Sequence, residues 1–118
     1  MDPGIVVVLC TAPSGDAEAI AELVVEKRLA ACVNLFGVGS VFWWEGEVAR
    51  EREELMVIKT RRDLLPALTA ALKGAHPYDV PEIIALPIID GDADYLAWVA
   101  GETRREERSG ERHPPECP

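Results

Sequence analysis

The sequence has few of the residues on which disulfide scaffolds and nucleic-acid-binding proteins depend. Its three cysteines, Cys10, Cys32 and Cys117, are far apart and form no CxxC pair. An odd number of dispersed cysteines argues against a disulfide framework and favours a reducing cytoplasm. Twelve Lys and Arg stand against 21 Asp and Glu, which gives a formal net charge of −9. Because such a surface repels phosphate backbones and anionic lipid, we expect no nucleic-acid and no membrane partner.

Catalytic and targeting signatures are also missing. The sequence contains no glycine-rich phosphate loop, no HExxH and no GxSxG motif, and it has only two histidines with which to perform acid–base chemistry. We therefore predict a binding or assembling protein, not an enzyme, with no obligatory cofactor. No apolar run is long enough to span a bilayer, and the opening residues lack the basic segment of a signal peptide. A cytoplasmic location is expected.

What is present predicts one α+β domain. A β-branched run at 5–10 predicts a buried strand, and the apolar spacing after it predicts a helix. Two strands follow between about 32 and 60, with a tight turn at Glu45-Gly46 and a bulge or sharp bend at Gly37 and Gly39. A second helix near 63–74, a strand at 82–86 and a short helix opened by Asp92 complete the pattern.

This order of elements is β-α-β-β-α-β, which is typical of a ferredoxin-like sheet with helices on one face. Two features extend it here: an additional C-terminal helix and a long hairpin arm between the second and third strands. Residues 1–101 are predicted to form this domain. Residues 102–118 are charged, Pro-rich and almost without apolar side chains, so they are predicted to be a disordered tail that a protease would trim.

Trp43 and Trp44 lie next to each other near the tip of the predicted arm. Neighbouring strand residues point to opposite faces, so both rings cannot be buried in so small a domain. One ring either stays half-exposed without a role or is covered by another subunit. We favour a subunit interface, because interfaces are enriched in Trp.

Cys10 and His76 are the candidate metal ligands. Each follows a regular element and borders a rigid turn, TAPSG or HPYDVP. A thiolate and an imidazole suit Cu⁺, Cu²⁺ and Zn²⁺. The alternatives are that Cys10 is a small buried apolar residue and that His76 is a turn residue bonded to the backbone. Two ligands alone do not fill a coordination sphere.

The stretches VVVLCTAPS, LAACVNLFGVGSVFWWEGEV, ELMVIKTR, HPYDVPEIIALPI and DYLAWV together resemble the CutA family of divalent-cation tolerance proteins. They cover about residues 5–100. The resemblance implies a ferredoxin-like protomer in a tight homotrimer, with hairpin arms that wrap neighbouring subunits, and an architecture similar to PII-type signalling trimers. It also implies that Cys10 and His76 match positions proposed as copper ligands. Ala75 stands where some members have a second histidine.

Two functions follow from this resemblance. The first is a trimer that binds divalent cations, with Cu²⁺ as the possible ion, and contributes to metal tolerance. The second is a PII-like scaffold that binds a small molecule or a partner protein in clefts between subunits. Family motifs place charged and aromatic groups in those clefts, and the candidates here are Lys59, His76, Tyr78 and Glu82.

Overall fold

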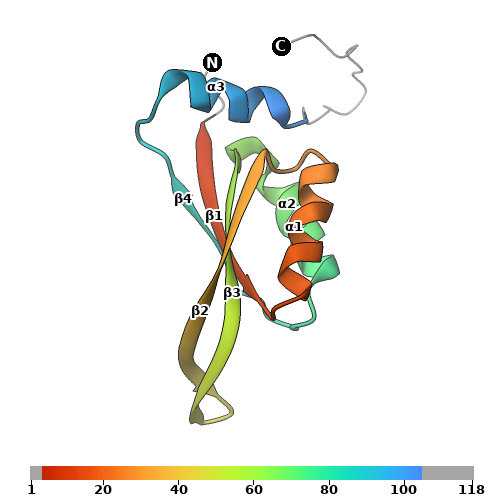
Figure 1. Ribbon diagram of the computed structural model, residues 1–118, viewed down its shortest axis with the longest axis vertical. Coiled ribbons are helices and arrows are strands. Elements are labelled where there is room, and N and C mark those ends of the chain that lie inside the picture. The colour runs from red at the N-terminus through yellow and green to blue at the C-terminus, as the bar shows by residue number, and fades with distance from the viewer. Residues whose placement is uncertain (1–3, 105–118) are drawn as a thin grey trace.

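The computed structural model describes residues 4–104 and confirms the α+β architecture (Figure 1). Four strands, three α-helices and one short 3₁₀ turn follow one another along this part of the chain. Their bounds are β1 Ile5–Ala12, α1 Asp16–Glu26, β2 Cys32–Trp44, β3 Glu47–Arg61, η1 Arg62–Leu64, α2 Leu65–Ala75, β4 Ile83–Pro87 and α3 Ala93–Glu102.

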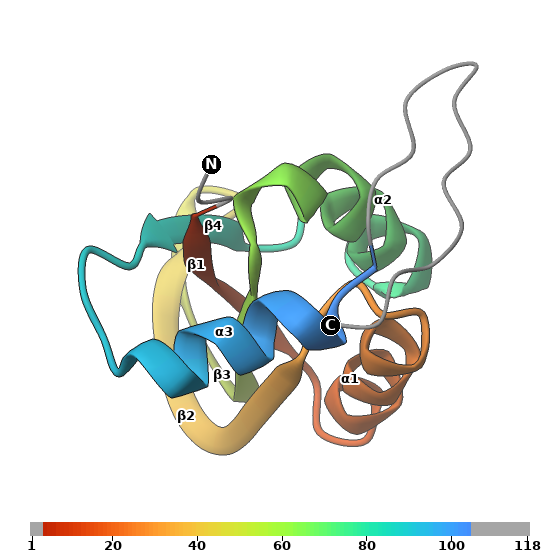
Figure 2. The ribbon, with the colours of Figure 1, turned by 90° about the horizontal axis from the view of Figure 1, so that it is seen from above.

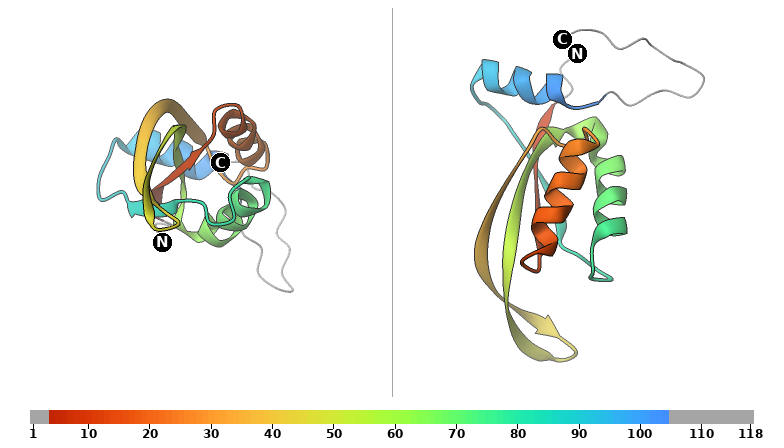
Figure 3. Two further views of the ribbon diagram at one scale, coloured as in Figure 1. Left: turned by 90° about the horizontal axis from the view of Figure 1, so that it is seen from below. Right: turned by 45° about the vertical axis from the view of Figure 1, so that its right-hand side comes forward.

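The strands form one sheet in the order β2-β3-β1-β4, and every neighbouring pair is antiparallel. Helices α1 and α2 lie side by side against one face of it (Figures 1 and 3). Alternate residues of the two central strands point into this layer, where Val8, Cys10, Met56 and Ile58 are fully buried. The helices contribute the other half of the core through a set of apolar side chains: Ala17, Ile20, Ala21, Val24, Leu68 and Leu72.

The β2–β3 hairpin extends beyond the rest of the sheet, because β1 pairs with β3 only over residues 54–61. Its two-residue turn has positive φ at Glu45 (51°) and Gly46 (81°), as a type I′ hairpin turn requires. The predicted bulge at Gly37 and Gly39 is wrong. The register runs without an extra residue from Cys32↔Lys59 to Trp44↔Glu47, and the hairpin curves smoothly instead (Figure 1).

Helix α3 crosses the end of the sheet (Figure 2). It begins where the sequence predicts, because the Asp92 carboxylate accepts a hydrogen bond from the Tyr95 N–H at 2.9 Å. Its last turn is held by Arg61 of β3, whose Nη1 donates to the carbonyl of Thr103 at 3.1 Å and whose Nη2 donates to that of Arg104 at 2.6 Å. Thr103 is buried. The fold therefore continues to Arg104, past the predicted boundary at 101, and residues 105–118 of the predicted tail lie outside the described residues.

Within residues 4–104, no helix combines the length and the apolar character needed to cross a bilayer.

Candidate functional site

Cys10 lies on the helix-facing side of β1, between Met56 of β3 and Ile83 of β4. Its side chain is fully buried. This burial, followed by the negative charges of Glu82 and Glu53, raises the pKa of the thiol to about 12. Because the thiolate is the form that binds metals and attacks electrophiles, the protonated Cys10 is a poor ligand and a poor nucleophile at neutral pH.

His76 forms the C-cap of α2, and both of its ring nitrogens are engaged by backbone groups. Nδ1 accepts the N–H of Tyr78 at 3.1 Å. Nε2 lies 2.7 Å from the carbonyl oxygen of Thr11, to which it donates. These two bonds assign the neutral tautomer with the proton on Nε2. The ring, which is 9 % exposed, thus joins the loop after α2 to the end of β1.

Tyr78 continues this connection toward the arm. Its hydroxyl donates to Oε2 of Glu53 at 2.9 Å, and its ring centroid lies 4.9 Å from that of His76. Desolvation, the hydrogen bond to Glu53, and the charges of Glu53, Glu51 and Asp16 together raise the pKa of the phenol to about 12. Tyr78 therefore fixes the loop to the base of the arm in a strongly acidic environment.

The predicted cleft residues are only partly brought together within one protomer. Glu82 is exposed, and its charge acts on the Cys10 thiol. Lys59 lies in a different part of the sheet, opposite Val7 of β1, where its ammonium contacts Oδ1 of Asn34 and lies 3.8 Å from Sγ of Cys32. His76, Tyr78 and Glu82 thus form one group, and Lys59 does not belong to it.

Copper ligation by Cys10 and His76 needs a deprotonated thiol and a free ring nitrogen lone pair. The two residues do lie at the same end of β1, since His76 bonds to the residue after Cys10. However, the thiol holds its proton, and the lone pair on Nδ1 already accepts from Tyr78. Ala75 offers no donor atom. Residues 4–104 contain no group of three His, Cys, Asp or Glu side chains arranged to hold a metal ion. The pair therefore does not fit a preformed copper site within one protomer.

The pKa of Cys10 makes stability depend on pH in the alkaline range. The folded thiol titrates at about 12 instead of its ordinary 9.0, so the folded state keeps a proton that the unfolded chain loses above pH 9. The stabilisation is complete below pH 9 and is lost as pH rises toward 12, by at most about 1.4 kcal/mol per pH unit for this group. Urea unfolding of wild type and Cys10→Ala at pH 8 and pH 10 should show a smaller decrease in the variant. Equal decreases would show that Cys10 does not carry this effect.

The face of the sheet opposite the helices is a second feature, which the sequence analysis did not assign to a function. Cross-strand pairing places Leu9, Val57 and Ile84 in one row on this face, and Val7 and Leu86 in the next, together with Lys59. Phe36, Ile84 and Leu86 are 51 %, 50 % and 49 % exposed. The sequence carries a sign of this second apolar face, because β1 is apolar at nearly every position, as in strands that are buried on both faces.

The arm adds to this exposed apolar surface. Trp43 is 75 % exposed and Trp44 63 % exposed. They point to opposite faces of the hairpin, and Trp43 pairs directly with Val48 while Trp44 pairs with Glu47. Because Val41 alternates onto the same face as Trp43, that face carries three exposed apolar side chains in a group.

Fold and exposed surfaces together define a ferredoxin-like α+β domain with one uncovered sheet face. The chain matches the family described as "CutA1 divalent ion tolerance protein" over residues 6–102, and it belongs to this family. It is 48 % identical over 99 residues to the divalent-cation tolerance protein CutA of Thermus thermophilus, covering 82 % of this chain and 96 % of the relative. It is also 50 % identical over 101 residues to the chloroplastic protein CutA 1 of Oryza sativa subsp. japonica. That match covers 84 % of this chain but only 57 % of the longer plant protein.

Solved structures agree with the family assignment. The crystal structure of CutA1 from Oryza sativa superposes with a TM-score of 0.85 at 47 % identity, covering 87 % of this chain and 96 % of that one. The PII-like protein CutA from Nostoc sp. PCC 7120 superposes with a TM-score of 0.81 at 33 % identity, covering 84 % and 97 %. The fold predicted from the sequence is thereby confirmed.

Proposed function

We propose that this protein is a cytoplasmic homotrimer that contributes to divalent-cation tolerance as a PII-like binding scaffold, not as an enzyme. The observation that carries the proposal is the apolar sheet face that α1 and α2 leave uncovered. Exposed apolar surface of this kind on a single domain is normally covered by another protein. The same face recurs on every copy of the chain, so copies of the chain are its natural partner.

In a closed ring the uncovered sheet face of each copy is buried against its neighbours, and no unpaired surface remains at either end. Three copies with their sheets turned inward bring the rows around Leu9 and Val7 together at a common axis and leave α1 and α2 outside. The resemblance to the CutA family and to PII-type trimers supports three as the number of copies. In this assembly the arm, which has no support from its own protomer, lies against a neighbouring copy.

The arm then buries one of its two tryptophans. The face of Trp43 carries Val41 and Val48, whereas the face of Trp44 carries Phe42 and the charged Glu47. Trp43 is also the more exposed of the two rings. We assign Trp43 to the subunit interface and leave Trp44 on the outer side. Burial of an aromatic ring typically stabilises an interface by about 1.5–3 kcal/mol.

The electrostatics of the loop 76–82 favour a positively charged ligand. Glu53 is only 7 % exposed, and the charges of Glu51 and Asp16 act on the same tyrosine. Glu82 adds a further negative charge nearby. These carboxylates attract a divalent cation through their charge, without forming a preformed group of three ligands within residues 4–104. The loop lies at the base of the arm, so a bound cation is placed to influence the contact between arm and neighbour.

Direct copper ligation by Cys10 and His76 is the second candidate, and the positions of these residues in the family support it. Copper titrations by calorimetry distinguish attraction of the ion by the carboxylates from ligation by Cys10 and His76. If the carboxylates attract the ion, Glu82→Gln should weaken binding several-fold and Cys10→Ala should bind like wild type. Cys32→Ala serves as a matched control, because this partly buried cysteine lies away from the loop.

The opposite result would identify the thiol–imidazole site. Binding that is lost in both Cys10→Ala and His76→Ala would establish direct ligation. Binding unchanged in all of these variants would move the site elsewhere, with His113 and Cys117 as the first residues to test. Absence of copper binding in wild type would leave the PII-like scaffold with another ligand.

A further inference from the structure

Cys32 of β2 and Lys59 of β3 form a thiol–amine pair on the face of the sheet opposite the helices. The two residues are direct partners in the register of these strands, and Nζ of Lys59 lies 3.8 Å from Sγ of Cys32. The same ammonium contacts Oδ1 of Asn34, the next residue of β2 on this face. Strand pairing therefore holds the thiol and the amine beside each other.

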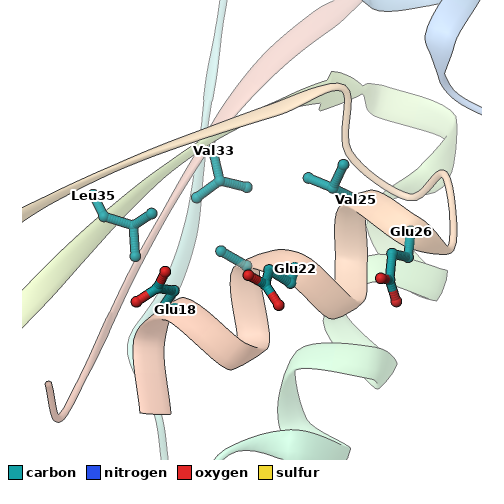
Figure 4. A pocket seen from close by; sticks show the side chains of 7 residues that line it. Glu18, Glu22, Val25, Glu26, Val33 and Leu35 are labelled. Atoms are coloured by element: carbon teal, nitrogen blue, oxygen red, sulfur yellow. The ribbon is translucent and has the colours of Figure 1, made fainter. Parts of the chain in front are cut away.

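The neighbouring residues of β2 point the other way. Val33 and Leu35 face α1 and line a groove of about 310 Å³ between β2 and this helix (Figure 4). Because strand residues alternate, Cys32 lies on the opposite side, away from the core. Its side chain is only partly buried. The sulfur is therefore open to a small solute.

The environment of Cys32 differs from that of Cys10, the other cysteine in residues 4–104. Burial first, and then nearby carboxylates, raise the pKa of the Cys10 thiol to about 12, and a buried protonated thiol is inert toward oxidants. A partly exposed thiol beside a lysine ammonium is the setting in which cysteines react. Desolvation and then the charge of Cys32 raise the pKa of the Tyr95 phenol, so this side chain of α3 borders the same thiol. Of the two thiols, Cys32 is the one suited to oxidation.

We propose that Cys32 and Lys59 are a redox modification site, at which hydrogen peroxide joins β2 to β3 through a covalent sulfur–nitrogen bond. In the first step the thiolate attacks one peroxide oxygen and the O–O bond breaks. Cys32 becomes a sulfenic acid, and the departing hydroxide takes up the proton that the thiol has lost, which gives water.

The second step consumes the sulfenic acid. The amine of Lys59, after giving its ammonium proton to solvent, attacks the sulfenic sulfur. The S–N bond forms, the S–O bond breaks, and the hydroxyl group leaves as water with a proton of the amine. Sulfenic acids condense with nitrogen nucleophiles in this way to give sulfenamides. In total, one peroxide is reduced to two waters and the sulfur loses two electrons.

The product requires little movement of the fold. The lysine stem is flexible, so the amine reaches the sulfur by side-chain rotation while both strands keep their pairing. The bond removes one positive charge from the sheet face and takes the ammonium away from Asn34. Two molecules of a thiol reductant restore the thiol and the amine and become a disulfide. Both residues belong to one chain, so the site does not depend on the number of copies in the assembly.

Peroxide treatment of the full-length Cys117→Ser variant, followed by tryptic digestion and mass spectrometry, tests the proposal. This substitution excludes disulfides to Cys117. Residues 29–50, which carry Cys32, should be joined to residues 53–61, which carry Lys59. The mass of the joined pair should be the sum of the two peptides less two hydrogen atoms, about 2 Da. Dithiothreitol added before digestion should remove the link.

Two lysine variants in the same background make the test specific. Lys59→Arg keeps the charge but offers a guanidinium that stays protonated, so the joined pair should fall about tenfold or more, and dimedone should trap the sulfenic acid on residues 29–50. Lys73→Arg makes the same change on α2 and should keep the link, as should Cys10→Ala. Oxidation of Cys32 without the link in the Cys117→Ser chain would overturn the proposal. A link that persists in Lys59→Arg, or oxidation of Cys10 in place of Cys32, would overturn it as well.

Discussion

Replacing Ile84 and Leu86 by glutamate is expected to convert the proposed trimer into monomers at micromolar concentration. Both side chains lie on the bare sheet face and are half-exposed in the protomer. In the proposed trimer they become buried, so the double variant places six carboxylates near one axis. Burial of an unpaired charge costs several kcal/mol, which exceeds what the surrounding apolar contacts can offset. Multi-angle light scattering after size exclusion measures the change in mass.

Ile89→Glu is the matched control for this experiment. Ile89 is 96 % exposed and lies after β4, outside the paired rows of the sheet. The same change from isoleucine to glutamate should therefore leave the mass unchanged. Circular dichroism of the double variant checks that its secondary structure is retained. A folded double variant with wild-type mass would mean that this face is not the subunit interface.

Replacing Arg61 by methionine is expected to destabilise the protein by about 2–4 kcal/mol. The guanidinium is nearly inaccessible and donates to the carbonyl groups of Ala100, Thr103 and Arg104 at the end of α3 and just after it. It also forms a two-point ion pair with Asp63, at 2.9 and 3.2 Å. Methionine fills a similar space but removes the charged donor from the carbonyl of Thr103 and from the carboxylate of Asp63. Urea unfolding at one fixed protein concentration measures the loss, because subunit assembly contributes to stability.

Two further variants show whether the loss of stability comes from the several hydrogen bonds that the planar guanidinium of Arg61 donates at once. Arg61→Lys keeps the charge but cannot reach several acceptors at once, so an intermediate loss is expected. Arg62→Met changes the exposed neighbouring arginine and should shift stability by no more than about 0.5 kcal/mol. If Arg61→Met were as stable as Arg62→Met, the contacts of Arg61 with α3 would have no energetic role.

The sequence predicted those features that depend on neighbouring residues. The hairpin turn follows from Glu45-Gly46, because a glycine readily adopts the positive φ that the turn requires. The start of α3 follows from Asp92, whose side chain bonds to an N–H three residues later. In both cases the cause and the structure lie within four residues of each other. The order of strands and helices follows from such signals together with the periodicity of apolar residues.

What could not be predicted depends on contacts between distant segments. The bond of His76 to the N–H of Tyr78 is local and agrees with the alternative of a turn residue bonded to the backbone. Its bond to Thr11 spans 65 residues, and the local sequence could not predict it. Arg61 holds Thr103 across 42 residues, a contact that the charged sequence after residue 101 did not predict. Lys59 lies opposite Val7 of β1 within one chain, and its grouping with Tyr78 in a cleft between subunits stays a prediction.

The solution mass of the wild-type protein tests the central claim most directly. One chain has a mass of 12.9 kDa. Multi-angle light scattering on a size-exclusion column at micromolar concentration should give three times this value, independent of dilution across the peak. A mass equal to one chain would contradict the assembly through the bare sheet face, and with it the scaffold function proposed for this protein.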